Sequence, residues 1–424
     1  MKIDMNIDLN HIARIEGHGD IHITVKNGKL ENAQWAVVET PRFFEAILRG
    51  KSFDLAPTLT SRICGICSIS HTLVSIRAVE RAMRVKVPES AKLLRLLAKH
   101  GETIQSHFLH LFFLVVPDFF NVGSVLPIVT SHPDIAQIAV RLKGMANDMC
   151  DIVTGRTTHP ISLVIGGLSM APDKSMLAKL KQMILDRRKD VFETIEFFKT
   201  LSIPDFSRET EFVSLKGESD YAWIGGNLIS TDGIEKTEND YLAMTNEYKV
   251  DFSTSKFSKL SRESMAVGAL ARFNNNYKFL CKEAKEVAWN FDLQPVNYNP
   301  FMNNIAQLVE AYHVMLESVE IINRLLDMDL SSVCSDYSIQ AGEAVGAVEA
   351  PRGILYHHYI IDKKGKINKA NCIIPTTQNH ANIHHDLKVL VEQQIKLGKD
   401  DREVAKLSEM LVRAYDPCVS CSVH

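Results

Sequence analysis

The stretch "YDPCVSCSVH", residues 415–424, decides how the rest of this sequence is interpreted. It holds two cysteines three positions apart, Cys418 and Cys421, and it ends at His424. Chain ends usually fray, and a dithiol on a frayed end is open to oxidation. The stretch therefore predicts that this end of the chain is tied down inside the protein.

A second cysteine pair stands near the other end of the chain. The stretch "RICGICSISH", residues 62–71, contains Cys64 and Cys67. Four thiolates favour soft transition metals, nickel and iron among them. Structural zinc sites usually combine pairs about 15 to 20 residues apart, so pairs at opposite ends of the chain predict a centre assembled by the whole fold. A structural zinc site and two separate redox dithiols remain open from spacing alone.

Composition narrows the class of protein. The chain has 424 residues, of which 46% are hydrophobic and 23% charged, with a net charge of -3. Such a mixture is typical of a globular protein, and no basic block points to nucleic acid or a membrane surface. The most apolar stretch, 108–120, is too short to cross a bilayer and contains Pro117. We expect a cytoplasmic protein without a membrane span.

Hydrophobic periodicity predicts a mainly α (α+β) fold, a bundle of long helices with peripheral β-hairpins. Helices are expected at 88–116, 132–155, 171–201, 262–290, 300–328 and 380–396. Residues 5–38 alternate as strands around a tight turn at Asn27-Gly28. We expect one domain over 1–424, with an N-terminal β-hairpin region (1–40), a β-containing peripheral insertion (202–260), a second hairpin region (345–375) and a buried C-terminal metal-binding tail (410–424).

The two cysteine stretches resemble the signature motifs of the large, catalytic subunit of nickel–iron hydrogenases. Five further stretches resemble that family in the same order: "RIEGHG" (14–19), "GRTTHPISLVIGG" (155–167), "VGALAR" (267–272), "EAPRG" (349–353) and "IIPTTQN" (373–379). The resemblance runs from residue 12 to the last residue and is nearest to the soluble, bidirectional, cytoplasmic branch. It implies that family's fold and the reversible, heterolytic cleavage of H₂ to two protons and two electrons.

The resemblance also implies a ligand set. Nickel is held by Cys64, Cys67, Cys418 and Cys421, with Cys67 and Cys421 bridging to an iron that carries one CO and two CN⁻ ligands. The Cys418 thiolate is the first proton acceptor, and Glu16 is the carboxylate of the proton relay. Arg352 lies over the open side of the centre, with Asp416 beside it.

Further residues match the surroundings of that centre. The resemblance implies that His71 lies close to the cysteines, that Pro351 packs against the diatomic ligands and that Thr376 donates to a cyanide. It implies a second metal, Mg²⁺ or Fe²⁺, held by Glu45, the backbone carbonyl of Cys372 and His424. A dedicated protease removes a C-terminal extension after this histidine in the family, once nickel is in place.

Electron transfer requires other chains. The remaining cysteines, Cys150, Cys281, Cys334 and Cys372, form no iron–sulfur motif, and no G-x-G-x-x-G stretch indicates a dinucleotide site. We expect no iron–sulfur cluster in this chain. The resemblance implies an iron–sulfur small subunit, further flavin- and NAD(P)-linked subunits, and maturation proteins as partners. Two rival interpretations are a relative of the quinone-site subunit of complex I, which lacks the cysteines, and a non-enzymatic Cys₄ zinc protein.

Overall fold

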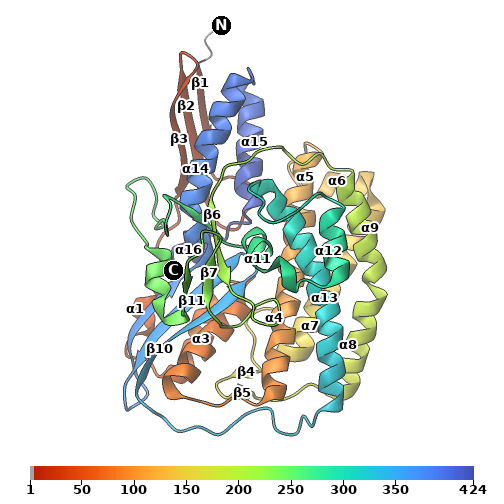
Figure 1. The fold of residues 1–424 in the computed structure, drawn as a ribbon, viewed down its shortest axis with the longest axis vertical. Coiled ribbons are helices and arrows are strands. Elements are labelled where there is room, and N and C mark those ends of the chain that lie inside the picture. Colours follow the sequence, from red (N-terminus) through yellow and green to blue (C-terminus); the bar gives the residue numbers. More distant parts are fainter. Residues whose placement is uncertain (1–3) are drawn as a thin grey trace.

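The computed structural model describes residues 4–424, so the first three residues of the predicted 1–40 region lie outside it. The expected fold class, mainly helical with small sheets, is confirmed (Figure 1). The long helices are α3 (Ser68–Met83), α4 (Glu89–Leu109), α7 (Pro133–Thr154), α8 (Lys174–Asp186), α9 (Arg188–Lys199), α13 (Asn303–Asp327), α14 (Pro375–Lys396) and α15 (Asp401–Ala414). The short ones are α1 (Phe44–Leu48), α2 (Ala56–Thr60), α5 (Val116–Phe119), α6 (Leu126–Ser131), α10 (Tyr241–Thr245), α11 (Ala269–Asn276), α12 (Lys282–Trp289) and α16 (Val419–Ser422).

The helical bundle fills one half of the molecule, and the sheets fill the other (Figure 1). In the bundle, α4 packs against α7 and α13, while α13 also packs against α8. In the other half, α14 packs on the N-terminal sheet and α3 packs on the buried sheet described below. No helix within residues 4–424 is long and apolar enough to cross a membrane.

The N-terminal sheet is antiparallel, with the strands in the order β1 (Met5–Leu9), β2 (Gly19–Lys26), β3 (Lys29–Val37). Its predicted tight turn is confirmed: Asn27 and Gly28 have φ values of 52° and 71° between β2 and β3. Positive φ at both central residues matches the right-handed twist of the strands. The same sheet leads, between β1 and β2, into the segment that carries Glu16.

A second antiparallel sheet contains β10 (Gly342–Ala350), β11 (Gly353–Ile361) and β12 (Ile367–Ile373). A two-residue turn, Pro351–Arg352, joins β10 to β11. Every residue of β11 except one is buried, so this sheet lies inside the protein with both faces covered. One cover is α3, which begins directly after Cys67. The first cysteine motif and the turn with Arg352 therefore belong to two packed neighbours.

The 202–260 segment contains β6 (Glu211–Leu215), β7 (Leu228–Ser230) and β8 (Glu235–Lys236). These strands form a sheet in the order β8-β7-β6-β9, whose last strand, β9 (Met265–Ala266), lies beyond the segment. Leu215 and its neighbours share a hydrophobic cluster with β10 and β11. The segment thus forms the other cover of the buried sheet.

Some predicted helix boundaries were wrong. The expected 262–290 helix is broken between α11 and α12, because asparagines compete for backbone groups: the Asn276 side chain donates to the carbonyl of Leu215, 2.9 Å away. The expected 171–201 helix divides at Arg187 into α8 and α9, and the 88–116 helix passes into a π-helical turn, η3 (His110–Val115). Periodicity also does not predict α3, which is buried nearly all round and so carries no polar stripe.

Close packing of α3 on β10 requires a glycine, Gly346, at the point of contact. A Cβ at Gly346 would lie 2.6 Å from the carbonyl oxygen of Val74 and 2.8 Å from the amide nitrogen of Ala78, both in α3. Gly346→Ala should therefore destabilise the protein by about 1–3 kcal/mol, because neither backbone can yield. Thermal unfolding of the purified complex would measure this loss as a lower Tm.

A control for this substitution is Gly144→Ala in α7, where the added Cβ meets no atom within 4 Å. Alanine in a helix interior is favoured over glycine by about 0.5–1 kcal/mol. We expect an unchanged or slightly higher Tm for this control. Equal Tm values for the two variants would contradict the packing assigned to Gly346.

Candidate metal centre

The C-terminal tail turns inward after α15 and lies inside the protein. Residues 411–424 are buried except for Ser420 and His424, which are half-buried. The turn is made at Asp416, whose φ is 49°. The backbone of the tail is then paired with the N-terminal region, since the amide of Val419 donates to the carbonyl of Glu16 at 2.8 Å.

Arg42 fastens the tail to the first cysteine motif. Its guanidinium donates to the carbonyl of Ser420 at 2.5 Å and to the carbonyl of Ile63 at 2.7 Å. Its own amide donates to the carbonyl of Val423 at 2.8 Å. The sequence gives no signal for this residue, because its partners are backbone groups from distant segments.

The fold brings the four cysteines of the two motifs together. One ligand atom from each of Cys64, Cys67, Cys418 and Cys421 lies within 4.8 Å of the others, and all four residues are buried. The Sγ atoms of Cys64 and Cys418 are 3.5 Å apart, and those of Cys67 and Cys421 are 3.9 Å apart. These two contacts each join one thiol from either end of the chain, and the Sγ atoms of Cys418 and Cys421 are 2.7 Å apart.

The electrostatics of this group favour a cation. Burial raises the pKa of the Cys418 and Cys421 thiols well above the ordinary value. Hydrogen bonds with Cys418 and Cys421 lower the pKa of Cys67, but Cys64 and burial together raise it to about 11. Burial also opposes ionisation of Cys64, but hydrogen bonds from the other thiols hold its pKa well below the ordinary value. Without a metal, the group therefore stabilises one thiolate, while a divalent metal ion stabilises several thiolates at once.

Arg352 reaches the cysteine group from the β10–β11 turn. Its Nε donates to the carbonyl of Asp416 at 2.7 Å, and its Nη2 donates to Oδ1 of the same residue at 2.9 Å. Burial lowers the pKa of Arg352, but Asp416 and the thiols raise it well above the ordinary value, so the group is a cation. Its Nη1 is buried and has no partner among residues 4–424. One charged donor is therefore left for a ligand.

Two residues that sequence reasoning did not single out hold Asp416. The amide of Gln307, on α13, donates to Oδ2 of Asp416 at 3.1 Å. His110, in the π-helical turn, acts on Asp416 through Gln307: its Nδ1 lies 2.6 Å from Oε1 of Gln307, and its Nε2 lies 2.7 Å from the carbonyl oxygen of Arg413. A π-helical turn re-aims side chains relative to a regular helix, and such turns often occur at functional sites. No sequence pattern marks this turn.

Glu16 lies against the tail at the second cysteine motif. The thiol of Cys418 donates to Oε2 of Glu16 at 3.1 Å, and the amide of Ser420 donates to the same oxygen at 3.1 Å. The hydroxyl of Ser420 donates to Oε1. Glu16 is half-buried, whereas Cys418 is buried. This carboxylate therefore connects a buried thiol to the outer part of the protein.

Of the three other residues expected near the cysteines, His71 and Thr376 lie beside them. His71 follows Cys67 by one helical turn, and burial lowers its pKa to about 4, so its imidazole is neutral. Thr376, near the start of α14, accepts a hydrogen bond from the amide of Cys418 at 2.9 Å. Its hydroxyl hydrogen is donated to no acceptor found within residues 4–424. Pro351 precedes Arg352 in the turn.

A second group of possible ligands lies at the end of the tail, formed by Glu45, Cys372 and His424. Nε2 of His424 lies 2.8 Å from the carbonyl oxygen of Cys372 and 3.7 Å from Oε1 of Glu45. The amide of Cys372 donates to the same Oε1 at 2.8 Å. Burial works to raise the pKa of Glu45, but His424 lowers it below the ordinary value. A carboxylate, a carbonyl and an imidazole suit a small divalent cation.

Comparisons with known proteins agree with this site. A family model described as nickel-dependent hydrogenase matches residues 42–137 and 208–424, and one described as HoxL-like matches residues 6–40. Sulfhydrogenase 2 subunit alpha of Pyrococcus furiosus is 32% identical over 421 residues, which are 99% of each chain. The beta subunit of the NAD-reducing hydrogenase HoxS of Cupriavidus necator is 30% identical over 463 residues, 98% of this chain and 94% of that one.

A crystal structure of an NAD⁺-reducing [NiFe]-hydrogenase in the H₂-reduced state has the same fold, with a TM-score of 0.90 over 99% of both chains at 24% identity. The expected large-subunit fold is thereby confirmed. The family match excludes the interpretation as a non-enzymatic zinc protein, and the four cysteines that lie together exclude a complex I-like subunit, which lacks them. The chain belongs to the nickel-dependent hydrogenase family and is the catalytic subunit of a [NiFe] hydrogenase, an oxidoreductase that acts on hydrogen.

Proposed function

We propose which residues of this chain bind the metals and which transfer the protons during reversible, heterolytic H₂ cleavage, H₂ ⇌ 2H⁺ + 2e⁻. The observation that carries the proposal is the junction of Cys418 with Glu16: a metal-ligating thiol and a carboxylate 3.1 Å apart. Heterolytic cleavage needs a base beside the metal. The Cys418 thiolate would be this base, and the Glu16 carboxylate would take the proton from it.

The cysteine group fits a nickel–iron pair. Four buried thiols suit thiophilic metals, and a charged donor without a partner lies beside them. Cys64 and Cys418 would be terminal ligands of nickel, and Cys67 and Cys421 would be shared with iron. When bound, the metal pair supplies the open coordination position for H₂ and takes up the two electrons.

The donors around the cysteines fit anionic diatomic ligands on the iron, one CO and two CN⁻. The free Nη1 of Arg352 is a charged donor, and the uncommitted hydroxyl hydrogen of Thr376 is a neutral one. A charge-assisted hydrogen bond suits a cyanide better than a neutral ligand. Pro351 has no N–H to donate and adds an apolar wall beside Arg352.

Protons would leave by Cys418 and Glu16. The Cys418 thiol shares a hydrogen bond with Oε2 of Glu16, while the Ser420 hydroxyl holds the other carboxylate oxygen. Because Ser420 fixes the carboxylate by its hydroxyl and its amide, the acceptor oxygen stays aimed at the sulfur. Neutral His71 supplies no competing charge near the cysteines. The proton therefore has one oriented acceptor.

We further propose Mg²⁺ or Fe²⁺ at Glu45, the carbonyl of Cys372 and His424. The three ligands come from α1, β12 and the last residue, so such an ion would tie the tail to two other elements. Maturation proteins, with a C-terminal protease among them, would act before the tail closes. The burial of the tail supports that order, because a folded tail leaves the four cysteines out of reach.

Electrons would pass to an iron–sulfur small subunit and on to flavin- and NAD(P)-linked subunits. The loop after α7 supports a contact surface near the centre: its His159 amide donates to Ser68 Oγ at 2.9 Å, next to Cys67. The segment between α7 and α8 exposes two large apolar side chains, Ile161 and Met170, at 59% and 72%. Exposed apolar side chains of this size suit contact with a partner chain. The eight free cysteines support a reducing compartment, the cytoplasm.

Loss of one thiol should empty the metal centre. We expect Cys64→Ser to lose most of its nickel and to retain below about 1% of the wild-type H₂ oxidation rate, because serine is a poor ligand for a soft metal. Nickel per chain is measured by mass spectrometry of the purified complex. Cys281→Ser, a half-buried thiol outside the group, should keep its nickel. Wild-type nickel in Cys64→Ser would remove that residue from the ligand set.

The diatomic ligands have a spectroscopic signature. Infrared spectra of the purified, active complex should contain sharp bands of metal-bound CO and CN⁻. Replacing Arg352 by lysine should shift a cyanide band, because a single ammonium cannot reproduce the planar guanidinium. Spectra without such bands, from a sample that oxidises H₂, would contradict the proposed iron ligands.

Glu16→Gln should separate proton transfer from metal assembly. The amide keeps the shape of Glu16 but cannot accept and release a proton, so H₂/D₂O isotope exchange should slow about 100-fold or more. Nickel content should stay at the wild-type level. Glu31→Gln, the same change at an exposed site on β3, is the control. Wild-type exchange in Glu16→Gln would show that protons leave by another route.

A further inference from the structure

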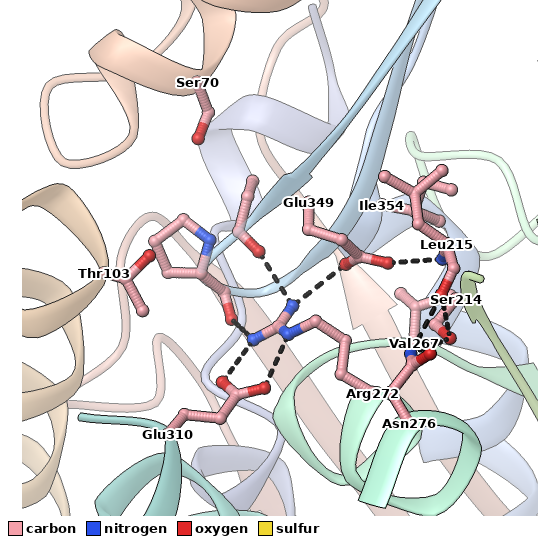
Figure 2. A network of polar contacts seen from close by, with 12 residues as sticks. Ser70, Thr103, Ser214, Leu215, Val267, Arg272, Asn276, Glu310, Glu349 and Ile354 are labelled. Carbon is pink, nitrogen blue, oxygen red and sulfur yellow. Dashed lines mark hydrogen bonds and ion pairs between the residues drawn. The ribbon is translucent and has the colours of Figure 1, made fainter. Parts of the chain in front are cut away.

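A second buried guanidinium lies behind the turn that carries Arg352. Arg272, on α11, is fully buried, and Figure 2 shows it at the centre of a polar network. Its Nε and Nη2 each donate to one oxygen of Glu310, on α13, at 2.7 Å. Its Nη1 donates to Oε2 of Glu349, on β10, at 3.0 Å. Two carboxylates from two different elements thus fix the plane of this guanidinium.

The remaining two N–H groups of Arg272 hold the turn itself. Nη1 donates to the carbonyl of Ala350 at 3.0 Å, and Nη2 donates to the carbonyl of Pro351 at 2.9 Å. Guanidinium has five N–H donors in a rigid fork, and all five are used here. Arg272 therefore holds the backbone of the turn, while the side chain of Arg352, in the same turn, binds Asp416.

Glu310 is itself fixed from two sides. The hydroxyl of Tyr221 donates to its Oε1 at 2.6 Å, and Nε2 of His107 lies 2.9 Å from its Oε2. Burial works to raise the pKa of Glu310, but Arg272 and His107 lower it to about 2. Glu310 is therefore an ionised partner for the Arg272 guanidinium. The guanidinium carbon of Arg272 also lies over the ring of Trp223, 5.2 Å from the ring centroid.

The same face of α13 also holds the partner of Arg352. Gln307, one helical turn before Glu310, donates to Oδ2 of Asp416. Residues three apart lie on one side of a helix. One helix therefore fixes both the turn beneath Arg352, through Glu310 and Arg272, and the carboxylate that Arg352 binds, through Gln307.

We propose that Arg272, set by Glu310, is a positioning residue that fixes where Arg352 stands at the metal centre. The inference rests on the proposed role of Arg352 toward the diatomic ligands. The plainer alternative is that the network only stabilises the fold. Breaking a buried charge pair destabilises a protein wherever it lies, so loss of stability alone does not separate the two.

A matched control is present in α4. Arg95 is buried and binds both oxygens of Glu80, at 2.9 and 2.7 Å. It also donates to the carbonyls of Val164 and Gly167, at 2.8 and 3.1 Å. Arg95 thus has partners of the same kind as Arg272, but one carboxylate where Arg272 has two, and its two carbonyls belong to residues 163–168. Arg272→Lys and Arg95→Lys should both lower the Tm.

Two measurements on the purified complex then separate positioning from stability. Amide hydrogen exchange of a peptide covering 348–356 should be about tenfold faster in Arg272→Lys, because the carbonyls of Ala350 and Pro351 lose their N–H donors. It should be unchanged in Arg95→Lys. Infrared spectra should show a shifted cyanide band in Arg272→Lys and the wild-type position in Arg95→Lys. In an Arg352→Lys background, Arg272→Lys should add little further loss of H₂ oxidation.

Glu310→Gln gives a second test if the lysine variant does not assemble. It keeps the shape of the partner but removes its charge, so it should shift the same cyanide band and speed exchange of the same peptide. Unchanged exchange and an unshifted band in both variants, with a lower Tm, would overturn the positioning role. A wild-type spectrum without diatomic bands would instead overturn the proposed function, while the exchange measurement would still decide whether Arg272 holds the turn.

Discussion

Buried thiolates repel one another, and this repulsion is the constraint on which the rest of the structure depends. Four cysteines lie within 4.8 Å in a region closed to solvent, where burial alone raises thiol pKa values. A divalent metal ion offsets that repulsion, so that the thiols can ionise and bind the metal. Because Cys418 and Cys421 lie on the tail, residues 411–424, that tail must be buried for the centre to exist.

The closure of the tail is distributed over many weak contacts. Arg42, Glu16 and Thr376 each bind a backbone group of the tail, and each comes from a different element. None of these contacts is strong alone, since a net hydrogen bond contributes about 0.5–1.5 kcal/mol. Together with the metal ligands they make one arrangement of the last ten residues favourable. The same contacts bring the Cys418 thiol to the Glu16 carboxylate, the proton acceptor proposed above.

The chemistry-bearing residues are easier to predict from sequence than their supports. Cysteine pairs at fixed spacing and the Asn27-Gly28 turn depend on local residue types, and the sequence shows those directly. Arg42, Gln307 and Arg272 act through backbone carbonyls or side chains far away in the chain, and no local pattern records such partners. The same holds for α3, whose burial on all sides removes the amphipathic stripe that periodicity detects. The break between α11 and α12 was missed because asparagine side chains bond to another segment.

In the proposed centre, both ends of the chain close on one nickel–iron pair. Crystals of the purified complex, measured by anomalous diffraction at the nickel, iron and zinc absorption edges, test it most directly. We expect a nickel peak enclosed by the Sγ atoms of Cys64, Cys67, Cys418 and Cys421, with an iron peak beside Cys67 and Cys421. Zinc alone at this position, or nickel bound elsewhere with the tail outside the protein, would contradict it.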